Sequence, residues 1–343
     1  MKAVIMAGGQ GTRLKAVTGE CPKPLVPLLG RPLMEHILLL LRRHGFTEVC
    51  AALQYRAGDI MDRFGDGSSL GLHLEYRVEE QALGTAGGVK NCADFCGGED
   101  VLVISGDAAC DFDLGELMRR HRESRCAVTL ALYRHPEPLR YGLAVTEPDG
   151  RIRSFIEKPP WGRVVTDLVN TGIYILSPRA LRRIPEGQSC DFARDLFPQL
   201  LREGELLLGV PLEGYWCDVG TPLSYYRCCV DALEGRLALE LPAAFSPPEA
   251  AESGEDRWSG AVQLDCPCRS RAGLMGALSE LMLEMHADYS DGIRLEGDRY
   301  RLHIAPLPQR SAIRIAVDSE DAEFARALAL SAKELAEALE HGL

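Results

Sequence analysis

The sequence predicts an α/β fold, a doubly wound mixed sheet over residues 1–235, followed by a small α+β domain. Three observations support this fold class. Short apolar runs of strand length alternate with amphipathic stretches of helical length through residues 1–235. Glycines or acidic residues follow several of these runs, as they do where parallel strands end at a ligand site. Pro, Ala, Ser and Glu then dominate residues 240–265, which separates a second pattern of strands and helices from the first.

The first half of the larger domain alternates regularly between strand and helix. Residues 1–6 form a buried strand because they are almost continuously apolar, and three glycines within four positions end it. Apolar residues at 34, 37, 38, 40 and 41 predict a helix over 34–44 that Gly45 terminates. The other elements of this half are strands at 48–53, 72–78 and 101–104, a helix at 57–64, and a helix to residue 93 that follows a second glycine segment at 83–88.

The second half keeps this alternation and adds a hairpin. A charged amphipathic helix at 116–125 leads into a strand at 127–133. Asp149-Gly150 predicts the turn of a hairpin between strands at 143–146 and 152–157. The remaining elements are strands at 169–176 and 206–211, a helix at 192–201, and a last helix that ends near Gly235.

Residues 236–265 have the composition of a flexible linker, and residues 266–343 have the pattern of a small α+β domain. A helix at 272–286 precedes a hairpin whose turn is Gly297-Asp298. A strand at 313–317 and a long amphipathic helix at 320–340 complete this domain. The sequence does not have the hexapeptide repeat of a left-handed β-helix.

Charge and cysteine usage limit the classes of function. The chain of 343 residues carries a formal net charge of −12, which disfavours nucleic acid as a partner. No apolar run has the length of a membrane span, and glycines interrupt the first apolar stretch, so we expect a cytoplasmic location and no membrane partner. The twelve cysteines are scattered without zinc spacing, and we expect them to be reduced and buried.

The most informative segment is Ala7-Gly8-Gly9-Gln10-Gly11-Thr12-Arg13-Leu14, with Pro22-Lys23-Pro24-Leu25 behind it. Glycines allow positive φ angles and let backbone N–H groups approach a ligand, as in phosphate-binding loops. A P-loop requires Gly-Lys, and a dinucleotide fingerprint requires glycine where Leu14 stands, so neither motif is present. Residues 1–31 contain five basic residues and one acidic residue, which predicts a site for a small polyanion.

The pattern Gly-Gly-x-Gly-Thr-Arg-Leu…Pro-Lys-Pro-Leu-x-Pro closely resembles the sugar-1-phosphate nucleotidylyltransferases. Family members usually have Arg-Pro after the first Leu, where this chain has Lys15-Ala16. The resemblance implies a Rossmann-like fold of the nucleotide-diphospho-sugar transferase type. It also implies transfer of a nucleotidyl group from an NTP to a hexose 1-phosphate, giving pyrophosphate and an NDP-sugar that serves as a polysaccharide precursor.

The resemblance is strongest to mannose-1-phosphate guanylyltransferases, which use GTP and mannose 1-phosphate to make GDP-mannose. This preference rests on the segment Leu83-Gly84-Thr85-Ala86-Gly87 and on the character of the tail. A glucose-1-phosphate thymidylyl- or uridylyltransferase is the alternative within the family. A non-catalytic regulatory protein that binds an NDP-sugar is an alternative of another class, and loss of the basic or acidic motif residues would be its sign.

Nucleotidyl transfer needs no general base, because the attacking oxygen belongs to a phosphate that is already ionised at pH 7. An enzyme for this reaction must bring two polyanions together and neutralise charge at the α-phosphate. Mg²⁺, Lys, Arg and backbone N–H groups are suited to both tasks. The eight histidines form no recognisable nucleophile–base pair, in agreement with such chemistry. Asp107 follows a buried strand, a position that suits either a cation ligand or a helix cap.

The resemblance implies a role for each matching residue. It implies catalytic roles for Arg13, Lys23 and Asp107, and Mg²⁺ binding by Asp107 and Asp218. It implies nucleotide binding by Ala7, Gly8, Gly9, Gly11, Thr12, Gln81, Gly84 and Thr85. It implies sugar-phosphate binding by Gly142, Glu157, Lys158, Asn170 and Thr171.

The tail at 266–343 resembles more weakly the C-terminal domain of the phosphomannomutase/phosphoglucomutase enzymes, through Asp291-Gly292-Ile293 and its order of strands and helix. The phosphate loop of that family is replaced here by Ala305-Pro306-Leu307-Pro308-Gln309-Arg310-Ser311, and a Ser-His-Asn-Pro nucleophile loop is absent from the sequence. We therefore expect a non-catalytic tail that serves assembly or docking. The sequence leaves open whether the chain forms a homo-oligomer.

Overall fold

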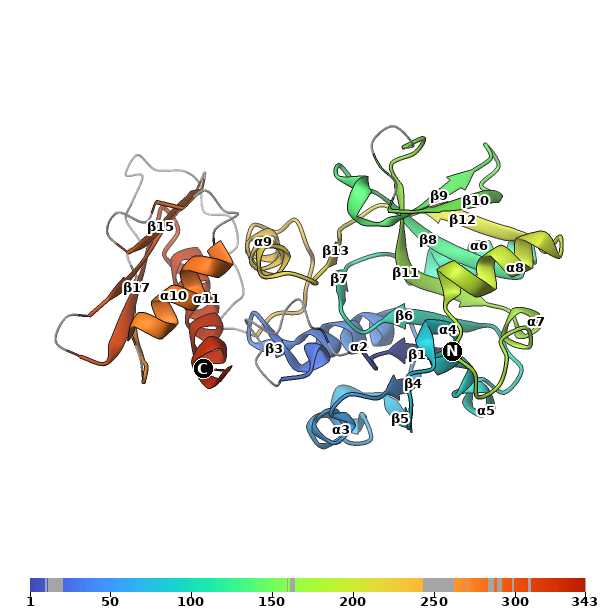
Figure 1. Ribbon diagram of the computed structural model, residues 1–343, viewed down its shortest axis with the longest axis horizontal. Coiled ribbons are helices and arrows are strands. Elements are labelled where there is room, and N and C mark those ends of the chain that lie inside the picture. The colour runs from blue at the N-terminus through green and yellow to red at the C-terminus, as the bar shows by residue number, and fades with distance from the viewer. Residues whose placement is uncertain are drawn as a thin grey trace. The chain divides into compact units, whose positions relative to one another are not determined.

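The computed structural model describes residues 1–9, 11, 21–158, 160, 164–242, 262–269, 271–282, 287–288, 292–297, 299–307 and 310–342 (Figure 1). The chain divides into two compact units, the first of Met1–Gln10 and Ile37–Trp216 and the second of Gly11–His36 and Cys217–Leu343. Helix α2 (Leu33–Arg43) therefore begins in the second unit and ends in the first, and strand β13 (Trp216–Asp218) does the reverse.

A mixed sheet forms the centre of the first unit, with nine strands among the described residues. Its order is β10-β9-β11-β6-β1-β4-β5, and β8 pairs with both β11 and β12. The strands are β1 (Lys2–Met6), β4 (Glu48–Leu53), β5 (His73–Val78), β6 (Val101–Ser105), β8 (Val128–Arg134), β9 (Gly142–Thr146), β10 (Ile152–Glu157), β11 (Leu168–Leu176) and β12 (Leu207–Pro211).

The sheet has a parallel part and an antiparallel part. Strands β6, β1, β4 and β5 are parallel neighbours, whereas β11 runs antiparallel to β6, β8 and β9. The hairpin of β9 and β10 continues the antiparallel part, as its turn at Asp149-Gly150 predicts. The predicted mixed α/β sheet is thus confirmed, with one parallel set (β6, β1, β4 and β5) on one side of β11 and the parallel pair of β8 and β12 on the other.

Helices cover the sheet because the central strands are buried on both faces. Val4 of β1 lies in a buried cluster with Ala86 and Val89, while Ala3 and Ile5 of the same strand are also fully buried. A strand buried on both faces has a continuous apolar sequence, which is why β1 was recognisable. The remaining elements of this unit are α3 (Ala57–Phe64), η3 (Ser68–Leu70), α4 (Gly84–Lys90), α5 (Ala93–Cys96), β7 (Ala108–Cys110), α6 (Leu114–Ser124), η4 (Pro138–Arg140), α7 (Pro178–Leu181), η6 (Phe192–Leu196) and α8 (Phe197–Arg202).

The helix predicted at 192–201 differs in its first turn. Residues 192–196 form the π-helical turn η6, in which the N–H groups of Leu196 and Phe197 bond to carbonyls five residues earlier, and α8 follows. Pro198 has no N–H to donate to the carbonyl of Arg194, so a regular α-helical bond is missing at this point. The side chain of Asp191 caps the wider turn by accepting the N–H groups of Ala193 and Arg194.

The second unit contains a small antiparallel sheet, with the order β14-β17-β16-β15 among the described residues. Helix α11 packs against β17, β14 and α9, and α10 packs against α9 and α11. The elements of this unit are η2 (Lys23–Leu25), β2 (Pro27–Leu28), β3 (Arg31–Pro32), α9 (Pro222–Leu233), β14 (Val262–Pro267), α10 (Arg271–Met282), β15 (Ile293–Gly297), β16 (Tyr300–Pro306), β17 (Ala312–Ser319) and α11 (Ala322–Gly342). The predicted α+β tail is confirmed.

Two sequence predictions for this tail need comment. Strand β14 was not predicted, and it begins at Val262, within the residues assigned to the linker. The predicted helix at 272–286 is seen as α10 to Met282, and residues 283–286 lie outside the described part of the chain. Most of the predicted linker, residues 243–261, and Asp298 of the predicted turn also lie outside it.

The cysteines agree with the sequence prediction. All twelve cysteines belong to the described residues and are free thiols, and only Cys21 and Cys217 are not fully buried. Burial raises the pKa of the Cys96 thiol to about 12, which keeps this thiol unreactive at neutral pH. No helix in the described ranges combines the length and the apolar character that crossing a bilayer requires.

Candidate active site

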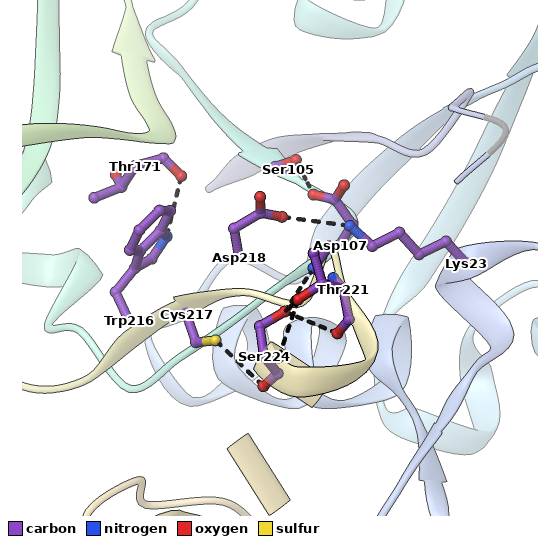
Figure 2. Close-up of polar contacts among 10 residues, drawn as sticks. Lys23, Ser105, Asp107, Thr171, Trp216, Cys217, Asp218, Thr221 and Ser224 are labelled. Atoms are coloured by element: carbon purple, nitrogen blue, oxygen red, sulfur yellow. Dashed lines mark hydrogen bonds and ion pairs between the residues drawn. The ribbon is translucent and has the colours of Figure 1, made fainter. Parts of the chain in front are cut away.

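The site in the first unit begins where β1 and β6 end. The N–H of Gly106 donates to the carbonyl of Met6 at 2.8 Å, which joins the two loops that follow these strands. An added Cβ at Gly106 would lie 3.0 Å from the Cβ of Ala7 and from the Met6 carbonyl oxygen, so a side chain there would force these neighbours to shift. The Ser105 hydroxyl donates to Oδ1 of Asp107 and orients that carboxylate (Figure 2). Asp107 is thereby fixed near the glycine segment after β1.

A pocket of about 290 Å³ opens at this edge of the sheet. We call it the glycine pocket, because four of its lining residues are glycines from two distant segments of the chain. Its lining residues are Met6, Gly8, Gly9, Ala52, Gln54, Glu79, Ala82, Gly84, Thr85, Gly88, Ser105 and Asp107. The pocket unites five residues singled out in the sequence, namely Gly8, Gly9, Gly84, Thr85 and Asp107.

Glu79 is a pocket residue that the sequence analysis did not identify. One carboxylate oxygen, Oε2, accepts the N–H of Leu83 at 3.0 Å, and the other lies where a Cβ of Gly88 would be. Partial burial raises the pKa of this carboxyl group. Gln81, which was predicted to bind the base, is exposed and does not line the glycine pocket. The position of Glu79 directly after β5 is the signal that could have identified it.

Gly84 and Thr85 anchor the wall of the pocket. Gly84 has a φ of +72°, and an added Cβ would collide with the backbone of Cys190. The Thr85 hydroxyl donates to Asp191 at 2.8 Å and accepts the N–H of Phe192 at 3.0 Å. The second glycine segment is therefore held against the start of η6, and the Thr85 hydroxyl is occupied by protein partners.

The second unit brings together Lys23 and Asp218, which are 195 residues apart in the chain. The Lys23 ammonium lies 3.4 Å from Oδ1 of Asp218 (Figure 2), and the Lys23 side chain is only 7% exposed. Gly11 belongs to the same cluster, because an added Cβ there would lie 3.1 Å from the Cβ of Lys23. A buried ammonium group needs a partner of opposite charge, and Asp218 provides one. Thr12 and Arg13 lie outside the described residues.

The residues predicted to bind the sugar phosphate gather around β9, β10 and β11. Gly142 and Glu157 are opposite each other in the β9–β10 pair, and an added Cβ at Gly142 would lie 2.9 Å from Oε2 of Glu157. Asn170 lines the same cavity as these two residues, and its Oδ1 accepts the hydroxyl of Tyr174 at 3.0 Å. Lys158 is exposed, and its φ of +39° lies in the left-handed region that non-glycine residues rarely adopt.

Thr171 and Ala7 have mainly structural contacts. Thr171 is 2% exposed, and its hydroxyl donates to the carbonyl of Ala131 at 2.7 Å. Its own carbonyl accepts the indole N–H of Trp216 at 3.1 Å (Figure 2). The N–H of Ala7 donates to the carbonyl of Ala52 at 2.9 Å, which extends the β1–β4 ladder by one residue. The side chain of Thr171 is therefore committed to the fold.

The chain thus has an α/β fold with a glycine-lined pocket at the ends of its parallel strands. The model of the nucleotidyl transferase family matches residues 2–235. The chain therefore belongs to the nucleotidyl transferase family, which confirms the resemblance read from the N-terminal motifs.

Characterised relatives come from more than one branch of this family. The chain is 37% identical over 237 residues to a mannose-1-phosphate guanylyltransferase of Mycobacterium tuberculosis, a match that covers 68% of this chain and 65% of the relative. It is 36% identical over 254 residues to a UTP–glucose-1-phosphate uridylyltransferase of Synechocystis, covering 70% of this chain and 64% of the relative. The matches thus span just under two thirds of the length of these relatives.

Solved structures resemble the larger part of the chain. HddC from Yersinia pseudotuberculosis complexed with GMP-PN has a TM-score of 0.60 and 28% identity, covering 67% of this chain and 99% of that one. A putative glucose-1-phosphate thymidylyltransferase from Bacillus anthracis in complex with sucrose also has a TM-score of 0.60, with 26% identity and coverages of 68% and 95%. These likenesses agree with the α/β sheet described above.

Proposed function

We propose that this protein transfers a guanylyl group from GTP to a hexose 1-phosphate, most closely mannose 1-phosphate, giving GDP-mannose and pyrophosphate in the cytoplasm. The observation that carries this proposal is the glycine pocket, which combines the family's glycine segments, Asp107 and the carboxylate of Glu79. The guanylyltransferase of Mycobacterium tuberculosis among the relatives supports the same substrates. Glucose-1-phosphate thymidylyl- or uridylyl transfer is the alternative, which the uridylyltransferase of Synechocystis supports.

Glu79 favours guanine over the other bases. A carboxylate is only an acceptor of hydrogen bonds, and the Watson–Crick edge of guanine presents two adjacent donors, N1–H and the N2 amino group. Uracil and thymine present one donor between two acceptors, so a carboxylate opposite them would face an acceptor. Oε2 of Glu79 is held by Leu83, and the absence of a Cβ at Gly88 gives the carboxylate its place against α4. A fixed acceptor of this kind suits a guanine base.

The reaction requires positioning and charge neutralisation. An oxygen of the hexose 1-phosphate attacks the α-phosphorus of GTP, the bond to the bridging oxygen breaks, and pyrophosphate leaves with the electron pair. We assign the backbone N–H groups of Gly8, Gly9 and Gly11, with Arg13 and Lys23, to binding the triphosphate and neutralising its developing charge. No side chain needs to remove a proton, because the attacking phosphate oxygen is already an anion.

Mg²⁺ is the cofactor that we propose, with Asp107 and Asp218 as its protein ligands. Carboxylate oxygens are the ligands that Mg²⁺ prefers, and Mg²⁺ usually takes one or two of them together with substrate phosphates. The described residues contain no group of three or more His, Cys, Asp and Glu side chains that could hold a metal ion by themselves. The bound ion would supply positive charge at the α-phosphate.

For the sugar phosphate, we assign Glu157 and Asn170 to the hydroxyl groups and Lys158 to the phosphate. Gly142 leaves room beside the Glu157 carboxylate, and an alanine there would close that space. The left-handed backbone of Lys158 costs about 1 kcal/mol or more, and such strain is typical of residues held for a ligand. Thr171 would take part in sugar binding only through its backbone, because its hydroxyl group already donates to the carbonyl of Ala131.

A pyrophosphate-release assay with four NTPs and several hexose 1-phosphates tests this proposal directly. We expect turnover with GTP and mannose 1-phosphate that exceeds every other pair. Preference for UTP or dTTP with glucose 1-phosphate would establish the alternative within the family. Binding of GDP-mannose without turnover of any pair would favour the regulatory protein, although Lys23, Asp107 and Asp218 are all retained in this chain.

A further inference from the structure

We propose that the cavity beside β10 selects a hexose 1-phosphate that carries a second anionic group, and that Arg153, Arg194 and Arg202 recognise this group. The inference rests on the proposed function, because the same cavity contains residues assigned to the sugar. It goes beyond that function by naming a class of acceptor. The three arginines match none of the family motifs in this sequence.

The cavity has a volume of about 380 Å³ and lies between β10 and the helical segment formed by η6 and α8. Arg153 and Glu157 both belong to β10 and are four residues apart, which separates their Cα atoms by about 13 Å along the strand. Arg194 and Arg202 line the cavity from the helical side. A ligand held at Glu157 can therefore extend along the strand toward a basic region.

The three guanidinium groups have no ion-pair partner within the described parts of the chain, although this chain is acidic overall. Their neighbours are different: Arg151 pairs with Asp149 at 2.7 Å, and Arg183 pairs with Glu203 at 3.1 Å. Guanidinium groups bind phosphate and carboxylate groups through paired N–H donors. Three unpaired guanidinium groups around one cavity form a site for an anion.

The remaining lining suits the carbon skeleton of a sugar. Phe155 stacks on Phe197 with ring centroids 5.4 Å apart, and together with Pro198 and Leu201 it gives the cavity half-buried apolar walls. Ligand sites commonly combine such apolar walls with a few charged groups that fix orientation. The π turn that carries Arg194 is a second indication, because π turns occur frequently at functional sites.

The test compares mannose 1-phosphate with mannose 1,6-bisphosphate as acceptors for GTP. We expect kcat/KM to be higher for the bisphosphate by roughly tenfold or more, as one charged hydrogen-bonded pair provides. R194A and R202A should each lower kcat/KM for the bisphosphate roughly tenfold. Each should leave kcat/KM for mannose 1-phosphate within about twofold of the value for the parent protein. R182A is the matched control, since Arg182 is exposed, has no ion pair within the described residues, and lies outside the cavity.

Two results would overturn this inference. The first is equal use of both acceptors with no effect of R194A or R202A, while turnover of mannose 1-phosphate is normal. The second is an increase in turnover on addition of inorganic phosphate, without competition between phosphate and the acceptor. This result would show that the arginines bind a separate effector. Failure of every hexose 1-phosphate to react would instead refute the proposed function. Equal melting temperatures of the variants and the parent protein would exclude a folding defect as the cause of the change.

Discussion

At the scale of the residue, the proposed preference for guanine depends on one carboxylate. The Oε2 atom of Glu79 accepts the N–H of Leu83, and the other carboxylate oxygen occupies the space that Gly88 leaves open. GTP and ITP differ only in the N2 amino group of the base. They are therefore a matched pair of substrates with which to test whether this carboxylate accepts that amino group.

We predict that E79Q reduces the preference for GTP over ITP. Glutamine keeps the size of the side chain but replaces one acceptor oxygen by a donor, and hydrogen bonds to charged groups contribute about 1.5–3 kcal/mol. The parent protein should use GTP more than tenfold better than ITP, and the variant should use both about equally, as measured by kcat/KM. E80Q is the control, since Glu80 is exposed and does not line the pocket. An unchanged ratio in E79Q would exclude Glu79 from base recognition.

Single residues also show how far the sequence could predict the site. Gly8, Gly9 and Asp107 follow strands whose apolar sequences are unmistakable, so their place at one edge of the sheet could be inferred. Glu79 directly follows β5, so its place at this edge could also have been inferred, but the space that its carboxylate occupies depends on the missing Cβ of Gly88, nine residues away on another element. The hydroxyl bonds of Thr85 and Thr171 depend on strands and helices far along the chain, and local sequence does not reveal them.

At the scale of the element, the C-terminal helix α11 supports the segments that follow Lys23 and Asp218. Within the second unit, the Tyr225 hydroxyl of α9 donates to the carbonyl of Pro27 at 2.6 Å. Glu334 of α11 accepts the backbone N–H of Gly30, and α11 packs directly on α9. The turn after η2 and the helix after Asp218 therefore share one supporting helix.

Glu334 gives this support a dependence on pH. Burial and the neighbouring Glu337 raise its pKa from 4.5 to about 6, and its Oε2 has no hydrogen-bond partner among the described groups. The folded protein therefore holds this proton more tightly than the unfolded chain does. By linkage, this group makes the protein less stable as the pH rises from about 4.5 to about 6, and the loss persists above that range.

We predict that E334Q raises the melting temperature at pH 7.5 and changes it little at pH 5. Glutamine keeps an acceptor for the Gly30 N–H and removes the charge that burial disfavours. Thermal melting of the two proteins at both pH values measures this difference. E337Q provides a comparison, since Glu337 is more exposed and pairs with Lys333 at 3.4 Å. Destabilisation of E334Q at pH 7.5 would contradict this account of Glu334.

Strand β14 and the helical segment at 192–201 differ from the sequence predictions for physical reasons. Strand β14 alternates between more buried and exposed residues, but its first residues fall within a stretch that was assigned to the linker on composition, and its partner β17 lies about fifty residues further along. Pro198 removes a backbone donor inside a segment with a helical pattern, and the chain responds with a π turn. Most of the longer strands and helices have strong apolar periodicity, and their predicted bounds were close to those observed. The short elements β2, β3, β7, β13 and α7 were not predicted.

At the scale of the whole molecule, the tail is integrated into the second unit. Tyr226 of α9 donates its hydroxyl to Tyr300 of β16 at 2.7 Å, and Tyr225, Cys228 and Cys229 of α9 are almost completely buried. Residues of α9, which lie within the range matched by the family model, and residues of the tail thus share one hydrophobic core. An assembly or docking role for the tail, which the sequence suggested, would be additional to this structural role.

We predict that removing residues 262–343 strongly destabilises the remaining chain. Loss of the tail would uncover the buried face of α9, and each large buried side chain contributes about 1.5–3 kcal/mol. The melting temperature and nucleotidyl transfer should both fall, which calorimetry and pyrophosphate release would measure. A chain cleaved within residues 243–261 with the tail still bound is the control, and it should keep both properties. An active and stable truncated protein would show that the tail is an independent module.

The account as a whole depends on Asp107 and Asp218 acting on one triphosphate through one Mg²⁺ site. The most direct measurement is the Mg²⁺-dependent release of pyrophosphate by D107N, D218N and the double variant. We predict that each single variant loses on the order of a hundredfold or more in kcat, and that the double variant loses little beyond the worse single one, because both side chains serve one step. Near-normal turnover of either single variant, or losses that multiply in the double variant, would contradict the proposed active site.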